Sequence, residues 1–296
     1  MSTFSRRDAM RLMLAGGAAA AVLGGTELEA AARINSVVRG VQLGAQSYSF
    51  RDLPHDQIID QYRTVGLGEA ELWQGTVEPQ HLSGAALRKW RLTVPLSHYH
   101  RLREKFDRGG VLIYAYNFSF RKDMTDDEMK RGFDAARALG VNKMTASSNV
   151  SLAKRIDQWA QQYKITVGFH GHDQTQDPDE FSTEATFERA LKGNSHYLGI
   201  NLDIGHYVAA NGDPVAFLKK WHDRIVTIHV KDRKKNHGSN EPFGQGDTPI
   251  VQVLQLVRDR GWKFPANIEY EYGRPGLDTI TEMKRSVAYC RKALES

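Results

Sequence analysis

Short apolar or β-branched runs recur along the chain, and each of them ends in polar residues. Eight such runs can be counted: Val41–Tyr48, Glu69–Trp73, Val111–Phe118, Lys143–Ser147, Thr166–His170, Gly199–Asp203, Val226–Val230 and Ala266–Glu269. Brief apolar runs bounded by polar residues are typical of β-strands. The pattern therefore predicts eight short strands.

Between most of these runs, apolar residues recur with the period of an α-helix. The clearest helical segments are Thr125–Leu139, Leu152–Tyr163, Pro214–His222, Pro249–Arg260 and Thr279–Leu294. Gly140 and Gly261 follow two of them, at the place where glycine ends a helix. One long excursion, residues 74–110, contains the helical pattern Leu96–Phe106 and is predicted to be an elaborated connection between a strand and a helix.

Strands that alternate with helices pair in parallel through right-handed crossovers. Eight such units in about 260 residues match the size of a closed (β/α)₈ barrel, the TIM barrel of the α/β class. The alternative is an open, doubly wound sheet, but no Gly-x-Gly-x-x-Gly turn follows the first strand. No linker separates the units, so we expect one barrel domain from residue 33 to residue 296.

The first 32 residues differ in kind from the rest. Ser5, Arg6 and Arg7 lead into a weakly apolar stretch rich in Ala and Gly over residues 12–25, and three alanines follow at 30–32. This order is typical of a twin-arginine export signal. An ordinary first helix is the alternative, but so much glycine makes a poor helix, and the run is short for a membrane span. We therefore expect residues 1–32 to be removed, and a periplasmic or secreted chain without a stable membrane anchor.

Composition adds little about partners. The net charge is +5, but 40 basic residues are interleaved with 35 acidic ones, and only Arg233–Lys235 form a short basic run. Scattered charge is typical of a solvated surface, so no nucleic-acid partner is predicted. The single cysteine, Cys290, excludes an internal disulfide. The sequence leaves the oligomeric state open, a homo-oligomer included.

In a (β/α)₈ barrel the active site is built where the strands end. Four predicted strands end in side chains that bind metals, and further polar residues follow within three positions. The strand ends carry His170 with His172, Asp203 with His206, His229 with Lys231, and Glu269 with Glu271. Residues two apart on a strand share a face, so His170 and His172 can both line the barrel mouth.

Taken singly, each of these residues has a simpler explanation. Asp203 could cap a helix, His229 could be a hydrogen-bonded core residue, and Glu269 could pair with a lysine. Their coincidence at neighbouring strand ends indicates a site, because burying several charges without a cation is costly. Nitrogen and oxygen ligands without a thiolate favour one divalent ion among Mn, Co, Zn, Ni and Fe.

These motifs resemble the sugar phosphate isomerase/epimerase family, the xylose-isomerase-like barrels. The resemblance covers roughly residues 40–290 and rests on Leu202–His206, Asp213–Leu218, Arg224–Asp232, Phe243–Asp247 and Ile268–Glu269. It implies a metal held by Asp203, His229 and Glu269, with His206 contacting the substrate. The epimerases carry a fourth ligand, Glu, at the end of strand five, where this chain has His170. A metal-bound imidazole cannot also act as a base, so the two-carboxylate route of the epimerases is incomplete here.

The resemblance implies a metal-dependent sugar or polyol isomerase or epimerase, which removes a proton beside a carbonyl through a metal-stabilised enediolate. Glu269 is the predicted base, or Glu271 if the register differs by two residues, and His206 is the second predicted catalytic residue. His172 and Lys231 are predicted to bind a small-molecule sugar or glycoside. Glu71 is predicted to do the same, although it could equally be an exposed strand-end charge. Strand-end aromatic residues such as Tyr48 and Trp73 could stack on a sugar ring or serve only as core.

Two other functions stay open. A lyase or hydratase acting on a keto-sugar or keto-glycoside would share the first step and then expel a leaving group. Export and the missing second carboxylate favour it. A carbohydrate-binding barrel without catalysis would result if His170 reflects a decayed site. Abasic-site endonucleases share the barrel, but they need a larger ligand cluster and a basic groove, neither of which the sequence shows.

Overall fold

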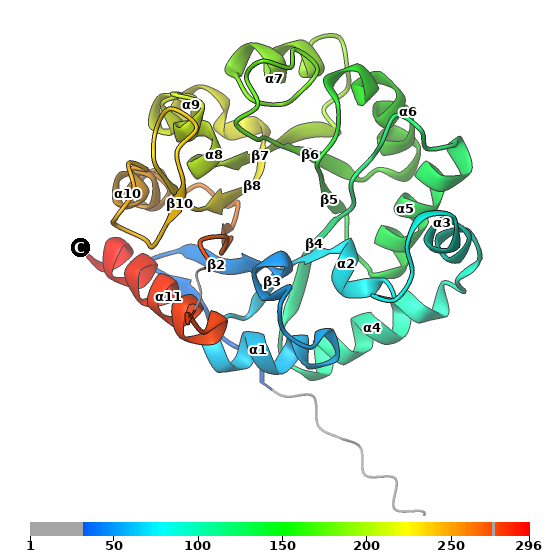
Figure 1. The fold of residues 1–296 in the computed structure, drawn as a ribbon, viewed down its shortest axis with the longest axis horizontal. Coiled ribbons are helices and arrows are strands. Elements are labelled where there is room, and N and C mark those ends of the chain that lie inside the picture. The colour runs from blue at the N-terminus through cyan, green and yellow to red at the C-terminus, as the bar shows by residue number, and fades with distance from the viewer. Residues whose placement is uncertain (1–31, 274–275) are drawn as a thin grey trace, which may run out of the picture.

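In residues 32–273 and 276–296, which the computed structural model describes, eight parallel strands form a closed barrel (Figure 1). They are β2 (Val41–Gln46), β3 (Glu69–Trp73), β4 (Leu112–Asn117), β5 (Lys143–Ala146), β6 (Thr166–His170), β7 (Leu198–Asp203), β8 (Ile225–Val230) and β11 (Ala266–Ile268). β2 pairs with both β3 and β11, and this closes the sheet. The predicted barrel is confirmed, with every strand end within two residues of its predicted place.

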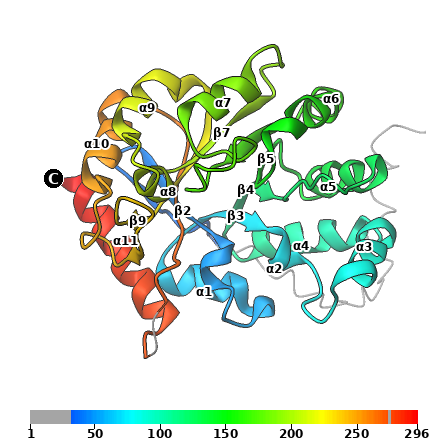
Figure 2. The same ribbon diagram turned by 45° about the horizontal axis from the view of Figure 1, so that its top comes forward.

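The helices form a ring outside the strands (Figure 2). They are α1 (Ile58–Val65), α2 (Gln74–Val77), α3 (Gly84–Thr93), α4 (Ser97–Arg108), α5 (Asp126–Ala138), α6 (Ala153–Tyr163), α7 (Glu184–Leu191), α8 (Ile204–Ala209), α9 (Pro214–Trp221), α10 (Ile250–Arg260) and α11 (Thr279–Glu295). Short 3₁₀ turns lie at Ser47–Phe50, His55–Gln57, Val150–Leu152 and His222–Arg224. Two small antiparallel pairings, β1 (Val37–Val38) with β2 and β9 (Asp232–Arg233) with β10 (Asn240–Glu241), complete the described elements.

The long connection from residue 74 to residue 110 holds three helices instead of the one predicted. α4 is the predicted one, shifted by one or two residues, and α2 is a single turn. α3 has no buried residue. A helix without a buried face has no apolar stripe for the periodicity to reveal.

Local sequence explains where other helices begin and end. Thr125 and Glu128 form a reciprocal capping box that starts α5, with the Thr125 N–H donating to Glu128 Oε2 at 2.8 Å. Gly66 and Gly261 end α1 and α10 in the left-handed region, with φ of 76° and 65°.

The interior of the barrel is polar. Side chains alternate along each strand, and the residues that face inward are polar on several strands. Inward-facing pairs two residues apart include Glu69 with Glu71, Asn201 with Asp203, and Thr227 with His229. Contacts across the barrel confirm their direction, since Glu71 on β3 lies 2.9 Å from His229 on β8. The intervening residues, such as Ala70, Leu202 and Ile228, belong to the apolar core between strands and helices.

The predicted export signal covers residues that the structure does not describe, apart from residue 32, and it stays a prediction. In the described part of the chain, no helix has both the length and the apolar character needed to cross a membrane.

Gly44 is expected to tolerate no side chain. A Cβ there would lie 1.6 Å from Glu69 Oε2 and 2.3 Å from Asn267 Oδ1 inside the barrel. Gly44→Ala should lower the free energy of unfolding by roughly 3 kcal/mol through overpacking, as measured by urea denaturation. Gly273→Ala is the matched control, because its Cβ would meet nothing closer than the Tyr270 hydroxyl at 3.7 Å. Equal stability of the two variants would contradict this packing.

Candidate metal centre

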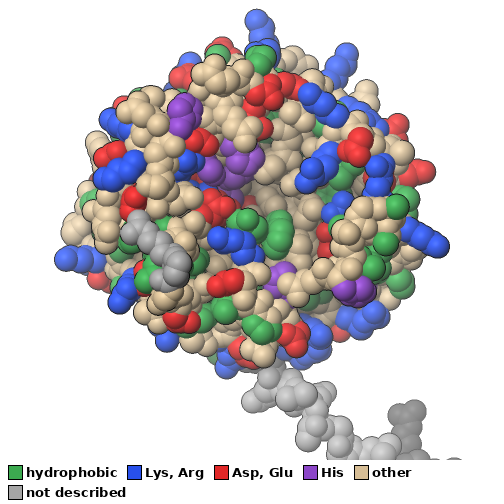
Figure 3. Space-filling model, in the orientation of Figure 1, with side chains coloured by type: hydrophobic (Ala, Val, Ile, Leu, Met, Phe, Trp, Pro, Cys, Tyr) green, Lys and Arg blue, Asp and Glu red, His purple; other side chains and the backbone are tan. Residues whose placement is uncertain are grey.

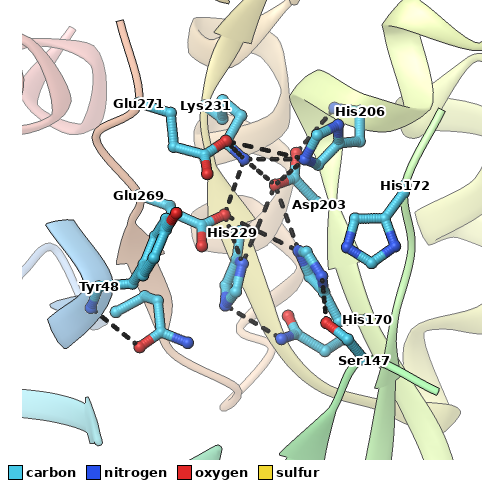
Figure 4. Close-up of polar contacts among 12 residues, drawn as sticks. Tyr48, Ser147, His170, His172, Asp203, His206, His229, Lys231, Glu269 and Glu271 are labelled. Carbon is cyan, nitrogen blue, oxygen red and sulfur yellow. Dashed lines mark hydrogen bonds and ion pairs between the residues drawn. The ribbon is translucent and has the colours of Figure 1, made fainter. Parts of the chain in front are cut away.

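Histidine and acidic side chains gather around the hollow at the centre of the face drawn in Figure 3. Among the described residues, four of them form a buried cluster suited to a metal ion: His170, Asp203, His229 and Glu269. His170 ends β6, Asp203 ends β7, His229 is the last but one residue of β8, and Glu269 directly follows β11. The structure thus brings the four predicted ligands together (Figure 4).

The donor atoms have the spacing that a shared ion requires. One donor atom from each residue lies within 4.8 Å of the other three. His229 Nδ1 is 3.0 Å from Glu269 Oε2 and 3.9 Å from Asp203 Oδ2, and His170 Nε2 is 3.4 Å from Asp203 Oδ2. Two ligands at about 2.1 Å from one tetrahedral ion lie roughly 3.4 Å apart. The two imidazoles and two carboxylates therefore fit a single divalent ion.

The protonation states suit metal binding at two of the ligands. Burial lowers the pKa of His170 to about 4, so its ring is neutral near pH 7 and Nε2 can offer a lone pair. Burial would raise the pKa of Asp203, but Lys231 and His206 outweigh it and hold the pKa well below its usual value. Asp203 is therefore an anion.

Glu71 fixes the orientation of His229. His229 Nε2 lies 2.9 Å from Glu71 Oε2, while Nδ1 faces the cluster. The Nε2–H group can donate to Glu71 and leave Nδ1 for an ion, the usual arrangement of a carboxylate behind a metal-binding histidine. Burial alone would lower the pKa of His229. Glu71 and Glu269 outweigh this effect and raise the pKa well above its usual value. An ion at Nδ1 would replace the proton there.

The structure shows that Glu71 is buried. This side chain is 0% exposed and is not among the residues that line the cavity. It accepts hydrogen bonds from Thr145 Oγ1 at 2.6 Å and Gln46 Nε2 at 3.1 Å. Glu71 is therefore not an exposed charge, and its contact with His229 Nε2 suits a residue that positions this ring, while its predicted contact with substrate stays a prediction.

Lys231 is buried as well. It is 2% exposed and does not line the cavity. Its Nζ lies 2.9 Å from Asp203 Oδ2, 2.8 Å from Glu269 Oε2 and 2.6 Å from Glu271 Oε2. Gly205 leaves room for it, because a Cβ there would lie 2.9 Å from Lys231 Cβ. Lys231 therefore compensates the charge of three carboxylates, and its predicted contact with substrate stays a prediction.

A cavity of about 260 Å³ opens above the cluster. The described residues that line it are Gln46, Tyr48, Trp73, Asn117, Ser119, Ser147, His170, His172, His206, His229, Glu269 and Glu271. The predicted site residues His172 and His206 thus face this space. Glu271 lines the cavity but lies outside the ligand cluster, so Glu269 is the residue in ligand register.

His172 and His206 are held by partners that the sequence did not reveal. His172 Nδ1 lies 3.0 Å from Glu180 Oε1, and His206 Nδ1 lies 2.6 Å from Arg233 Nη1. Glu180 lies in an irregular loop after β6, where no periodicity marks it. Asn117 and Ser147, by contrast, lie at the ends of predicted strands and could have been found by the rule that located the ligands.

Comparison with known proteins assigns the family. The family described as "Xylose isomerase-like TIM barrel" matches residues 87–293. The chain belongs to this family. The resemblance seen in the sequence is thereby confirmed for the fold and the family.

Curated relatives of this chain include a sugar phosphate epimerase. L-ribulose-5-phosphate 3-epimerase of Escherichia coli K12 is 30% identical over 95 residues, which are 30% of this chain and 33% of the relative. This chain is matched to less than half the length of its curated relatives.

Solved structures share the fold over most of the chain. The IolI protein with a bound zinc atom has a TM-score of 0.64 at 16% identity, covering 86% of this chain and 98% of the other. The probable 3-DHS dehydratase AsbF of Bacillus anthracis has a TM-score of 0.60 at 16% identity, covering 84% and 98%. At such identities the likeness shows the fold alone.

Removing a ligand should remove the ion. Asp203→Ala and His229→Ala are expected to lose bound divalent metal, because an ion at the cluster would then lack one of its four protein ligands. Glu271→Ala is the control and should keep the metal, since Glu271 lies outside the cluster. Elemental analysis of protein purified without chelators gives the occupancy. Full occupancy in Asp203→Ala would disprove the assignment of the centre.

Glu71→Gln should weaken metal binding without removing a ligand. Loss of the carboxylate behind a metal-binding histidine lowers affinity by about 10- to 100-fold. Calorimetric titration of the metal-free protein with Zn²⁺ or Mn²⁺ measures this. Glu180→Gln should leave the affinity unchanged, because no hydrogen bond or ion pair joins Glu180 to the four ligands in the described residues. An unchanged affinity in Glu71→Gln would rule out its positioning role.

Proposed function

We propose that this chain is a divalent-metal-dependent sugar isomerase or epimerase that removes a proton from a carbon beside a carbonyl. The observation that carries the proposal is the ligand cluster of two imidazoles and two carboxylates at the floor of a small cavity. Family members that include a sugar epimerase and fold relatives that include a dehydratase support an enzyme of this chemical class.

Glu269 is the proposed base. An ion in the cluster would polarise the carbonyl oxygen and stabilise the negative charge that develops on it. Glu269 lines the cavity while its Oε2 faces the cluster, so the same carboxylate reaches the bound substrate. Burial alone would raise the pKa of Glu269. Lys231 and His229 outweigh this effect and hold the pKa well below its usual value. Glu269 is therefore ionised but weakly basic, and it depends on a substrate whose C–H bond has been made more acidic.

His206 is proposed to act on the hydroxyl groups of the substrate. It lines the cavity, with Nε2 3.0 Å from Lys231 Nζ and Nδ1 beside Arg233. A neutral imidazole has one lone pair, so only one of these two cationic donors can hydrogen-bond to it at a time. A sugar hydroxyl that hydrogen-bonds to His206 would therefore replace one of these two contacts.

A second candidate function is a keto-sugar or keto-glycoside lyase or hydratase. Two histidines in the cavity wall favour it. His170 stands where the epimerases have a carboxylate, and His172 lines the cavity beside it. With Nδ1 of His172 paired to Glu180, its Nε2 is the nitrogen available to a ligand. Elimination needs one base and one acid that protonates the leaving group, and Glu269 with His172 supply that pair.

Proton exchange in deuterated water distinguishes these functions. Metal-loaded protein should place deuterium on the carbon beside the carbonyl of a ketose if it is an isomerase or epimerase. Glu269→Gln should reduce exchange by at least about 1,000-fold, and Glu271→Gln by less than about tenfold, compared at equal metal occupancy. Mass spectrometry and NMR detect the label.

A lyase would instead accumulate an unsaturated sugar or a free aglycone. An equal loss in the two glutamate variants would refute Glu269 as the base. Absence of both exchange and elimination over a panel of keto-sugars would refute the proposed function.

A further inference from the structure

The charge of the cavity wall is unusual for a family with sugar-phosphate relatives. Among the described residues that line the cavity there is no lysine and no arginine. The acidic residues that line it are Glu269 and Glu271. Proteins usually bind phosphate through guanidinium or ammonium groups, and the described lining of this cavity offers neither.

Among the described residues, three cationic side chains that contact residues of the cavity wall are already engaged. Lys231 contacts three carboxylates and is buried beneath the wall. Arg233 is 3.0 Å from Asp173 Oδ2 and donates to the Gly238 carbonyl. Arg51 donates to the backbone carbonyls of Tyr48 and Tyr270. A ligand phosphate could gain a countercharge from Lys231 or Arg233 only by breaking these pairings.

An aromatic wall lies on one side of the cavity. Tyr48 and Trp73 both line it, with ring centroids 4.9 Å apart in an edge-to-face arrangement. The Arg51 guanidinium packs over the Tyr48 ring at 4.4 Å, and Gly75 leaves room for the indole, because a Cβ there would lie 2.2 Å from Trp73. In the view of Figure 4, Tyr48 and His172 lie on opposite sides of the ligand cluster. A fixed aromatic wall of this kind suits the apolar C–H face of a sugar ring.

The rest of the wall is polar but neutral. Gln46, Asn117, Ser119 and Ser147 present amides and hydroxyls, which both donate and accept hydrogen bonds as sugar hydroxyls do. The volume of about 260 Å³ lies just below the range of roughly 300–1,000 Å³ that is usual for drug-sized ligands. One sugar ring matches this size.

We propose that the cavity binds an uncharged sugar ring, packed against Tyr48 and Trp73, and discriminates against sugar phosphates. The ring belongs to a free sugar or to a glycoside, which share this chemistry. The inference rests on the proposed function for the reacting carbonyl, and it goes further by separating this chain from relatives named for a 5-phosphate substrate.

Matched pairs of ligands test the proposal on metal-loaded protein. The pairs are L-ribulose with L-ribulose 5-phosphate and D-fructose with D-fructose 6-phosphate, and methyl 3-keto-β-D-glucoside represents the glycosides. Calorimetry measures binding, and deuterium exchange is followed in the same samples. The uncharged member should bind at least about tenfold more tightly than its phosphate. Stronger binding of the glycoside than of either ketose would identify a glycoside as the source of the ring.

Variants test the wall itself. Trp73→Ala should weaken binding of the uncharged probe by about tenfold, and Trp73→Phe should restore most of it. Trp262→Ala is the control, because Trp262 stacks on His222 and does not line the cavity. Ser119→Lys adds the missing cation, so it should raise affinity for the phosphorylated probes by at least about tenfold. Ser119→Lys does not depend on the folding of a truncated aromatic variant.

The outcomes separate this inference from the proposed function. Uncharged probes that bind without exchange would leave the inference standing and remove the proposed function. Exchange that occurs only with the phosphorylated members would do the reverse. Tighter binding of either phosphate, or no binding of any uncharged probe, would overturn the inference.

Discussion

The structure depends on how two carboxylates are kept ionised inside a closed barrel. Asp203 and Glu269 are both buried where strands end, and an unpaired charge there would cost several kcal/mol. His229 and Lys231 lie beside them and supply the nearest positive partners. Glu69 shows the alternative: deeper in the barrel, burial and the nearby Glu71 raise its pKa well above the usual value, so it takes up a proton.

Strand register brings these groups together. Asp203 on β7 is the direct Cα partner of His229 on β8, and His229 in turn pairs with Asn267 on β11, two residues before Glu269. Since side chains alternate along a strand, a slip of one residue would turn a ligand outward to the helices. The closed barrel permits no such slip, because each strand is fixed by two neighbours. Residues that lie far apart in the sequence thus come together in the cluster only because the strands pair in parallel.

This explains why the sequence predicted the cluster of four candidate ligands but not the burial of two of their neighbours. Chemically distinctive residues at predicted strand ends must lie near one another once the barrel is assumed, as His170 and Asp203 do. Position along a strand does not reveal depth, however. Glu71 lies inside its strand beneath His229, and Lys231 turns to carboxylates on other strands, so neither lines the cavity. Glu180 could not be found at all, because loop conformation brings it to His172.

The imidazole of His170 changes the charge of the centre as well as the supply of bases. With two carboxylates and two neutral imidazoles, the four residues would balance the charge of a divalent ion, and the Lys231 ammonium, which contacts both carboxylates, would add one positive charge beside it. A third carboxylate would cancel that charge, so the set with His170 would leave an ion the stronger Lewis acid toward a carbonyl oxygen. In the proposed reaction, this stronger activation of the substrate would offset the weak basicity of Glu269, whose carboxylate pairs with Lys231 and His229. Under the proposed function, a histidine at position 170 would both remove an opposing carboxylate base and strengthen activation of the substrate, and together these effects would favour a reaction that needs a single carboxylate base.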